Sequence, residues 1–234
     1  MPKLFIIPSC VSSQGSLMPD NRLNHLTYFI VEEAKTARAT LKKIIPSINL
    51  QAATFFVANE HTDQRQWQDI FKAIGQHDIG LVSEAGMPCV ADPGNALVLW
   101  AHHHDYEVIP LVGPSAIILA LAASGLNGQQ FAFHGYLPRG FDKRVAVIKG
   151  IEKDGIARNR TQIFIEAPHH NLSLFDDLIN HVNPTTLICI ASDLTGDKQQ
   201  VVTKTAKAWQ QAKVPDIDKI PTVFLMYTPP VDKK

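Results

Sequence analysis

The stretch IGLVSEAGMPCVADPG, residues 79–94, places a buried strand directly before a loop of small residues and prolines. The apolar run Ile79–Val82 predicts the strand, and Gly86 lets a ligand approach the loop backbone closely. Asp92 is a candidate N-cap for the next helix, with Pro93 at its first position. Such a strand–loop–helix junction is typical of nucleotide-like ligand sites, although an ordinary turn with capping residues has the same pattern.

On both sides of this stretch, short apolar runs alternate with helical patterns. Strands are expected at 3–7, 28–31, 53–57, 79–83 and 107–110, and helices at 21–26, 34–45, 63–75 and 95–104. The strands are too apolar for a sheet with one face in water, so we predict a mainly parallel sheet covered on both faces. Ligands bind such sheets at the carboxyl ends of the strands.

The segment Ser115–Ser124 predicts a helix that is apolar on every side. Such a helix must be buried all round, as it would be between two layers or two domains. The turn at 113–115 forms its entry, and Gly125 is a candidate C-cap. We therefore predict an N-terminal α/β domain at 1–112 and a C-terminal α/β domain at 113–234.

The second half has a different order of elements. Strands are expected at 131–134, 162–166, 186–191, 200–203 and 222–227, and helices at 143–153, 172–181 and 204–213. The strand at 200–203 follows its predecessor with no room for a crossover helix, so we expect a hairpin and a mixed sheet. The predicted fold class is therefore α/β, with two αβα domains.

Composition argues against several classes of protein. Hydrophobic residues make up 45% of the 234 residues, which disfavours disorder, and the 22 basic residues balance the 22 acidic ones, which argues against nucleic-acid binding by bulk charge. Three scattered cysteines indicate a reducing compartment, and no apolar run approaches the roughly 18 residues of a membrane span. The apolar run at 4–8 is too short for a secretory signal, so a cytoplasmic protein is expected. The common dinucleotide, P-loop, serine-hydrolase and zinc-protease motifs are absent from the sequence.

Three linked segments resemble the tetrapyrrole-methylase superfamily. They are SEAGMPCVADPG (83–94), VIPLVGPSAIILALAASGL (108–126) and FAFHGYLPRG (131–140). The likeness continues in RTQIFIEAPHHNLSLFDDL (160–178) and CIASDLTGDKQQVVTKTAKAW (189–209). Within the superfamily, the chain most resembles the branch that methylates the ribose 2′-oxygen of a cytidine in small-subunit ribosomal RNA.

The resemblance implies the tetrapyrrole-methylase fold, a homodimer, and S-adenosylmethionine in the cleft between the two domains. It implies a methyltransferase that acts on a ribose hydroxyl of ribosomal RNA and releases S-adenosylhomocysteine. Ribosomal RNA or the small ribosomal subunit would be the partner, and no metal or membrane is implied. Carried over by position, the cofactor-binding residues would be Pro8, Ser83, Glu84, Ala85, Gly86, Met87, Pro88, Val90, Ala91, Ser115, Ala116, Tyr136, Leu137, Ala191, Leu194, Pro221 and Thr222.

Four segments depart from the ribosomal branch. Where that branch has Thr-Pro-Ile-Gly-Asn-Leu after its first strand, residues 8–15 read PSCVSSQG, and its acidic pair followed by Thr-Arg becomes EEAK at 32–35. Its Tyr-Glu-Ser-x-His-Arg stretch becomes IEAPHH at 165–170, and its Arg-Glu-Leu-Thr-Lys stretch becomes SDLTG at 192–196. The wall that faces the substrate is therefore expected to differ.

Methyl transfer to a hydroxyl requires removal of its proton by a base. Glu32 and Glu33, just after a predicted strand, are the catalytic candidates, and the alternative is a solvated helix N-terminus favoured by the helix dipole. The three histidines at 102–104 would point in different directions on a helix, so they are not expected to share a metal ion. His169 and His170, in a loop after a strand, have either a surface role or a role at the site.

Seven basic residues lie between positions 139 and 160, against three acidic ones. They are Arg139, Lys143, Arg144, Lys149, Lys153, Arg158 and Arg160. This cluster fits an RNA-facing patch, a site for substrate carboxylates, or a solvated helix face. Three functions therefore stay open: a ribosomal RNA methyltransferase, a methyltransferase for a tetrapyrrole or another small acceptor, and a cofactor-binding module without catalysis.

Overall fold

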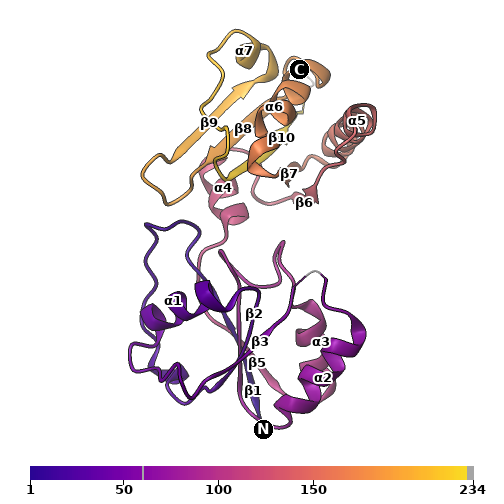
Figure 1. Cartoon of the computed structure of the whole chain (residues 1–234). Helices are drawn as coiled ribbons and strands as arrows, with labels where there is room; N and C mark the ends of the chain where they lie inside the picture. The colour runs from indigo at the N-terminus through magenta and orange to yellow at the C-terminus, as the bar shows by residue number, and fades with distance from the viewer. Residues whose placement is uncertain (60, 231–234) are drawn as a thin grey trace. The chain divides into compact units, whose positions relative to one another are not determined.

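The computed structural model describes residues 1–59 and 61–230. The chain divides into two compact units, Met1–Ser115 and a second unit that begins at Ala116. Each unit contains its own five-stranded sheet (Figure 1). In the described part of the chain, every helix is too short or too polar to cross a membrane.

The sheet of the first unit is entirely parallel, with the strand order β3-β2-β4-β1-β5. Its strands are β1 (Lys3–Ile7), β2 (Tyr28–Val31), β3 (Thr54–Val57), β4 (Ile79–Val82) and β5 (Glu107–Pro110). Its helices are the 3-10 turn η1 (Asn21–Leu23), α1 (Ala34–Ile44), α2 (Gln64–Ile74) and α3 (Asn95–His103). The predicted parallel α/β unit is confirmed.

Alternate residues of these strands pack against opposite helical layers. One apolar cluster joins Phe5 and Phe29 to η1 and α1, and the other joins Leu4 and Ile30 to α2 and α3. Figure 1 shows α1 on one side of the sheet and α2 and α3 on the other. A Cβ at Gly80 would lie 2.7 Å from the Phe29 ring, so β4 must carry glycine where this large side chain crosses it. Burial on both faces explains why the strands read as continuous apolar runs.

Two predictions about helices in this unit are wrong. The expected helix at 21–26 is only the turn η1, because asparagine, histidine and threonine at 24–27 are poor helix formers. The expected N-cap at Asp92, with Pro93 in the first turn, is also wrong, since α3 begins at Asn95 after Gly94. Gly94 has φ +126°, which only glycine adopts readily, so the chain enters the helix two residues later than the cap pattern indicates.

The second unit has a mixed sheet with the order β6-β7-β10-β8-β9. Its strands are β6 (Phe131–Tyr136), β7 (Thr161–Ile165), β8 (Leu187–Ser192), β9 (Gln200–Thr205) and β10 (Thr222–Tyr227). Its helices are α4 (Ala116–Ser124), α5 (Phe141–Arg158), the 3-10 turn η2 (Pro168–His170), α6 (Asn171–His181) and α7 (Ala206–Gln210). Only β6 and β7 pair in parallel, and β8 and β9 form the predicted hairpin.

The core of this unit lies between its sheet and helices α5, α6 and α7. The rings of Phe164 and Phe224 stack on neighbouring strands, and the Trp209 indole of α7 donates to the carbonyl of Ile188 at 2.9 Å. Helix α4 packs on β8, β9 and β10 by one face only. Ile118 is 51% exposed, so the second unit by itself does not bury this helix on every side, and burial between the two units stays a prediction. One row of its apolar side chains suffices to cover the strands it touches.

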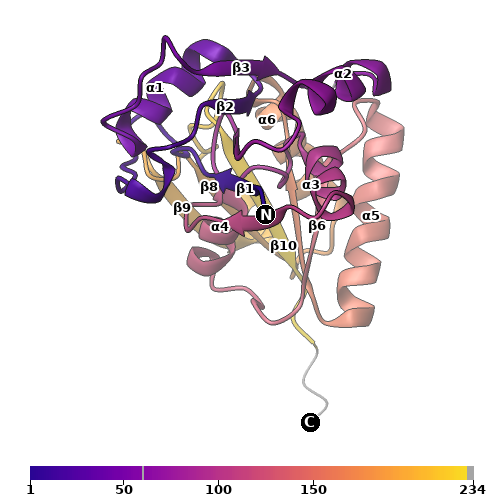
Figure 2. The same cartoon turned by 90° about the horizontal axis from the view of Figure 1, so that it is seen from below.

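A buried ion pair joins α5 to α6 in this unit. Arg144 and Asp177 are 6% and 4% exposed, and their side chains form a salt bridge. Arg144 also donates to Ser173 Oγ at 2.8 Å. Figure 2 shows α5 as a long helix at the side of the unit, and this pair fixes it to the rest of the core.

Candidate functional site

The loops after β1 and β4 start at neighbouring strand ends and leave in opposite directions. The chain after β1 continues to η1 on one face of the sheet, and the chain after β4 continues to α3 on the other face. Such a divergence is a topological switch point, where open α/β sheets bind their ligands. The stretch at 79–94 therefore lies where the fold itself favours a site.

Backbone and hydroxyl groups tie these two loops together. The N–H of Ser9 donates to the Gly86 carbonyl at 2.8 Å, and the N–H of Gly86 donates to the Ser9 carbonyl at 3.2 Å. Ser9 Oγ donates to the Ser83 carbonyl at 2.5 Å, and Ser83 Oγ donates to the Gly86 carbonyl at 2.9 Å. Both serines are buried. The base of the loop is therefore held in one conformation before any ligand arrives.

The loop after β5 packs against the loops after β1 and β4, and the three loops together form the bed of the candidate site. The backbone at Gly113 lies close to the Pro8 ring. A Cβ at Gly113 would lie 2.1 Å from Cγ of Pro8, which no side chain tolerates. A Cβ at Gly86 would lie 3.4 Å from the Pro114 carbonyl. The loops after β1, β4 and β5 thus pack against one another. The sequence pattern missed Ser9 and Gly113 as site-forming residues, because their partners lie more than 70 positions away.

The rim of the β4 loop has unusual backbone geometry. Cys89 and Ala91 have φ of +67° and +65°, and Gly86 has φ of +75°. Non-glycine residues in the left-handed region carry strain, and such strain collects at ligand sites. Val90 and Ala91 are exposed, whereas Ser83 and Gly86 at the base are buried. The loop therefore presents a short rim of small residues on a rigid base.

The two catalytic candidates have different roles in the structure. Glu33 is the N-cap of α1, and its side chain accepts a hydrogen bond from the Lys35 N–H at 2.7 Å. Glu32 accepts from the Glu84 N–H at 3.3 Å, so it lies against the β4 loop. Glu84 in turn accepts from Thr36 Oγ1 at 2.6 Å. Glu32 is brought to the candidate site, and Glu33 is committed to the helix end.

Asp92 adds a third carboxyl group to this region. Burial, and then the charges of Glu32 and Glu84, raise the pKa of Asp92 from its ordinary 3.8 to about 7. Its Oδ2 atom is buried and has no hydrogen-bond partner among the described residues. Burial, and then the charge of Asp92, raise the pKa of Cys89 to about 11, so this thiol stays neutral. The loop therefore holds a carboxyl group that gains or loses its proton near neutral pH.

The Asp92 carboxyl group should make stability fall as pH rises. The folded pKa of about 7 exceeds the unfolded value of 3.8, so the folded protein binds this proton more tightly. The free energy of unfolding therefore falls as pH rises from about 3.8 to about 7. Asp92→Asn should therefore stabilise the protein on the order of 1 kcal/mol at about pH 8, and less at about pH 5. Thermal unfolding at both pH values checks this. A variant less stable than wild type at the higher pH would show that the charged carboxylate has a stabilising partner.

The residues predicted from the second unit gather at one end of its sheet. Leu137 follows β6, Leu194 follows β8, and Thr222 begins β10. The register pairs Thr222 with Ser192 and Tyr136 with Ile165, so these strand ends lie side by side. The other predicted residues here are Ala191, within β8, and Pro221, before β10.

The loop after β8 repeats the backbone geometry of the β4 loop. Asp193 and Thr195 have φ of +47° and +67°, and the second is β-branched, which makes this conformation costly. Glu166 Oε2 and Asn171 Oδ1, both buried, have no hydrogen-bond partner among the described residues. The Asn171 amide donates to the Ile220 carbonyl at 2.7 Å, which places it beside the start of β10. Sequence reasoning did not single out either of these polar groups.

The structure divides the seven basic residues at 139–160 into buried, paired and exposed groups. Arg144 is buried against Asp177 and cannot face a ligand. Arg158 and Arg160 both pair with Asp154, at 2.9 Å for Arg158 Nε. The remaining basic residues, Arg139, Lys143, Lys149 and Lys153, are exposed. Sequence position alone had put the buried, paired and exposed basic residues in one cluster.

The histidines at 102–104 and 169–170 lie at the ends of helices. His102 and His103 end α3, and the His104 ring stacks on Trp100 with ring centroids 4.5 Å apart. His169 and His170 form the end of η2. Within residues 1–59 and 61–230, no group of three or more His, Cys, Asp or Glu residues is arranged to hold a metal ion.

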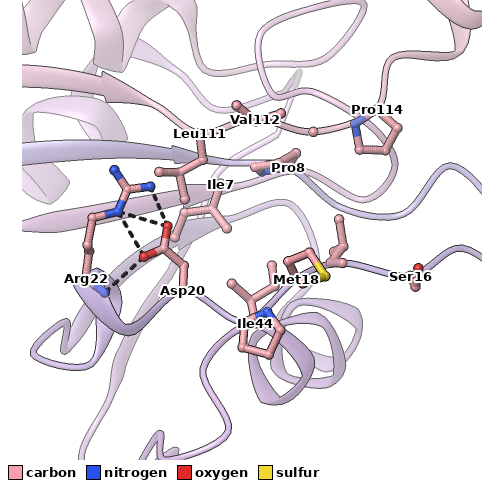
Figure 3. Close-up of a pocket in the computed structure, with 13 residues that line it drawn as sticks. Ile7, Pro8, Ser16, Met18, Asp20, Arg22, Ile44, Leu111, Val112 and Pro114 are labelled. Carbon is pink, nitrogen blue, oxygen red and sulfur yellow. Dashed lines mark hydrogen bonds and ion pairs between the residues drawn. The ribbon is translucent and has the colours of Figure 1, made fainter.

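A pocket of about 320 Å³ opens beside Pro8 in the first unit (Figure 3). One wall is the segment after β5, and the other is the segment that precedes η1 (Figure 3). Apolar side chains form most of its surface, and Asp20 and Arg22 lie at one end. The lining residues are Ile7, Pro8, Ser16, Leu17, Met18, Pro19, Asp20, Arg22, Ile44, Leu111, Val112, Gly113 and Pro114.

These features define the class of protein. The chain belongs to the Tetrapyrrole (Corrin/Porphyrin) Methylases, whose family profile matches residues 24–209. Among solved structures, the methyltransferase CobJ matches 97% of this chain and 95% of its own, with a TM-score of 0.64 and 16% identity. The cobalamin biosynthesis precorrin-6Y methylase of Archaeoglobus fulgidus matches 98% of each chain, with a TM-score of 0.54 and 12% identity. At these identities, the likeness shows the fold alone.

Among curated proteins, the chain is similar to several named Ribosomal RNA small subunit methyltransferase I. The protein of Vibrio cholerae is 30% identical over 194 residues, which cover 83% of this chain and 65% of the relative. That of Escherichia coli O157:H7 is 33% identical over 144 residues, covering 61% of this chain and 49% of the relative. The chain thus spans less than two thirds of the length of these relatives.

Proposed function

We propose that this chain is an S-adenosylmethionine-dependent methyltransferase that methylates a ribose hydroxyl of ribosomal RNA. Relatives that carry a ribosomal RNA methyltransferase name, together with membership of a methylase family, support this proposal. The observation that carries it is the rigid bed formed by the loops after β1, β4 and β5 at the switch point of the first sheet. The likeness to the two solved methylases extends to the fold and gives no support for a tetrapyrrole acceptor.

The residues present fit the cofactor. Buried Gly86 and the small rim residues Val90 and Ala91 allow the close approach of a nucleoside to the backbone. We propose that the rim of residues 83–91, with Pro8 and Ser115, contacts S-adenosylmethionine. The proposal extends to the residues predicted in the second unit, namely Ala116, Tyr136, Leu137, Ala191, Leu194, Pro221 and Thr222. When bound, the cofactor supplies a methyl group already activated on sulfonium, so the protein has chiefly to align the acceptor and exclude water.

Removal of the acceptor proton is the step left to the protein. Because Glu33 caps α1, we propose Glu32 as the base. Its contact with the Glu84 N–H holds it against the β4 loop, and its charge is felt by Asp92. A carboxylate in this position can accept the hydroxyl proton as the methyl group transfers.

The test is methyl transfer from radiolabelled cofactor to small ribosomal subunits, or their RNA, taken from a strain that lacks this protein. We expect labelling of one ribose, with no labelling of subunits from the parent strain, whose site is already methylated. Glu32→Gln should lower kcat by roughly 10²–10⁴-fold and leave cofactor affinity unchanged. Glu33→Gln is the matched control and should reduce stability only, by about 1 kcal/mol. Labelling of porphyrinoids in place of RNA would overturn the assigned acceptor, and full activity of Glu32→Gln would overturn the base.

A further inference from the structure

The pocket beside Pro8 is lined partly by the proposed cofactor loops and partly by residues outside those loops. Pro8 and the segment 112–114 belong to both. The opposite wall, Ser16–Arg22, precedes residue 24, where the match to the family begins. This wall therefore lies outside the residues that the family profile matches, at a place where a methyl acceptor could reach the loops.

The polar end of the pocket is a guanidinium group held in a fixed orientation. Arg22 Nε donates to Asp20 Oδ1 at 2.9 Å and to Oδ2 at 3.1 Å, and Nη2 also donates to Oδ2. These hydrogen bonds lower the pKa of Asp20, so the pair stays charged. Within the described residues, Nη1 of Arg22 has no hydrogen-bond partner, and the side chain is 66% exposed. Its free N–H groups can therefore bind an oxygen acceptor from outside.

We propose that this pocket binds one unstacked nucleotide of the RNA acceptor, with the base among the apolar side chains and a phosphate on Arg22. The inference rests on the proposed function. Apolar walls such as Met18, Ile44 and Leu111 suit the faces of any base, because every base has a stacking surface. Because Asp20 occupies the Nε and Nη2 side of the guanidinium, the phosphate contact is a single charge-assisted hydrogen bond from Nη1 of Arg22.

The size of the pocket supports a nucleotide over a macrocycle. Its volume of about 320 Å³ lies at the small end of ligand pockets, which suits one ring system with its sugar and not four linked rings. Proteins that recognise RNA by sequence commonly bind unstacked bases, and an unstacked base needs side chains on which to stack. In a chain with zero net formal charge, a single placed arginine gives a local phosphate contact without a broad basic surface.

Methyl-labelled methionine gives a direct readout, because three of the four methionines lie at informative places. Met18 lines the pocket, Met87 lies in the β4 loop, and Met226 is buried in the second unit as an internal reference. In NMR titrations with the four nucleoside 5′-monophosphates, we expect saturable shifts of the Met18 signal and none of Met226. The matching nucleosides, which lack phosphate, should bind at least 5-fold more weakly.

Two variants with matched controls separate base binding from phosphate binding. Arg22→Gln should weaken the monophosphates at least 5-fold, leave the nucleosides unchanged, and reduce the salt dependence of binding by about one phosphate contact. Ser16→Phe fills the pocket from its rim and should abolish the Met18 shifts for both. Arg65→Gln, on α2, and Ser13→Phe, in the same loop but outside the pocket lining, should bind as wild type does.

The outcomes distinguish this inference from the proposed function. A Met18 signal that no monophosphate moves at millimolar concentration, or an Arg22→Gln variant with unchanged phosphate preference, would overturn the pocket assignment even if the protein methylates RNA. If the monophosphates shift Met18 as expected, and S-adenosylhomocysteine shifts Met87, but no RNA is methylated, the pocket assignment holds and the RNA acceptor fails.

Discussion

Replacing Asp177 with alanine is expected to lower the free energy of unfolding of the second unit by about 3–5 kcal/mol. The Asp177 carboxylate and the Arg144 guanidinium are 4% and 6% exposed, so removal of the acid leaves a positive charge buried without its counterion. The hydroxyl of Ser173, which also accepts from Arg144 at 2.8 Å, is neutral and cannot replace it. Denaturant unfolding followed by tryptophan fluorescence measures the change, because Trp209 lies in the same core.

Two further variants show whether the loss comes from the buried charge. Asp176→Ala removes the exposed neighbouring carboxylate and should change stability by about 0.5 kcal/mol or less. The double variant Arg144→Met with Asp177→Leu removes both charges and should recover most of the loss. If the single and double variants were equally unstable, packing of these side chains, and not an unpaired charge, would explain the effect.

Gly113→Ala is expected to disrupt the bed of loops at the candidate site. Its Cβ would lie 2.1 Å from Pro8 Cγ, so either the proline ring or the backbone at 113–114 must move. Overpacking of this kind costs about 1–3 kcal/mol of stability. Because Pro8 and Pro114 both adjoin the β4 loop, affinity for S-adenosylhomocysteine should fall at least tenfold, or about 1.4 kcal/mol.

Gly128→Ala is the matched control for this variant. An added Cβ at Gly128 meets no atom within 4 Å, so the same chemical change should leave both stability and cofactor affinity near wild type. Calorimetric titration of the two variants gives the comparison. A Gly113→Ala protein that binds the cofactor as tightly as Gly128→Ala would show that the contact between Pro8 and Gly113 does not shape the site.

The strands and their layers could be predicted because a strand that is buried on both faces has a continuous apolar run in the local sequence. The run Ile79–Val82 is apolar at every position that carries a side chain, and the sheet indeed has a helical layer on each face. The hairpin of β8 and β9 followed from the short connection between them. The loop at 83–94 was identified as a candidate site from its small residues, and the fold places it at the switch point.

What the sequence could not predict depends on contacts between distant positions. Gly113 must be glycine because of Pro8, and Ser9 is tied to Gly86, yet neither pairing leaves a local pattern. The burial of Arg144 was missed because its partner lies on another helix, 33 positions away. The cap at Asp92 failed because Gly94 adopts a backbone conformation that residue type alone permits but does not require.

The most direct test of the central claim is calorimetric titration of the purified wild-type protein with S-adenosylmethionine and S-adenosylhomocysteine. We predict micromolar binding, or about −8 kcal/mol, that is lost when tryptophan replaces Ala91 in the β4 loop or Ala116 at the start of α4. Absence of binding of either compound at millimolar concentration would contradict the methyltransferase assignment.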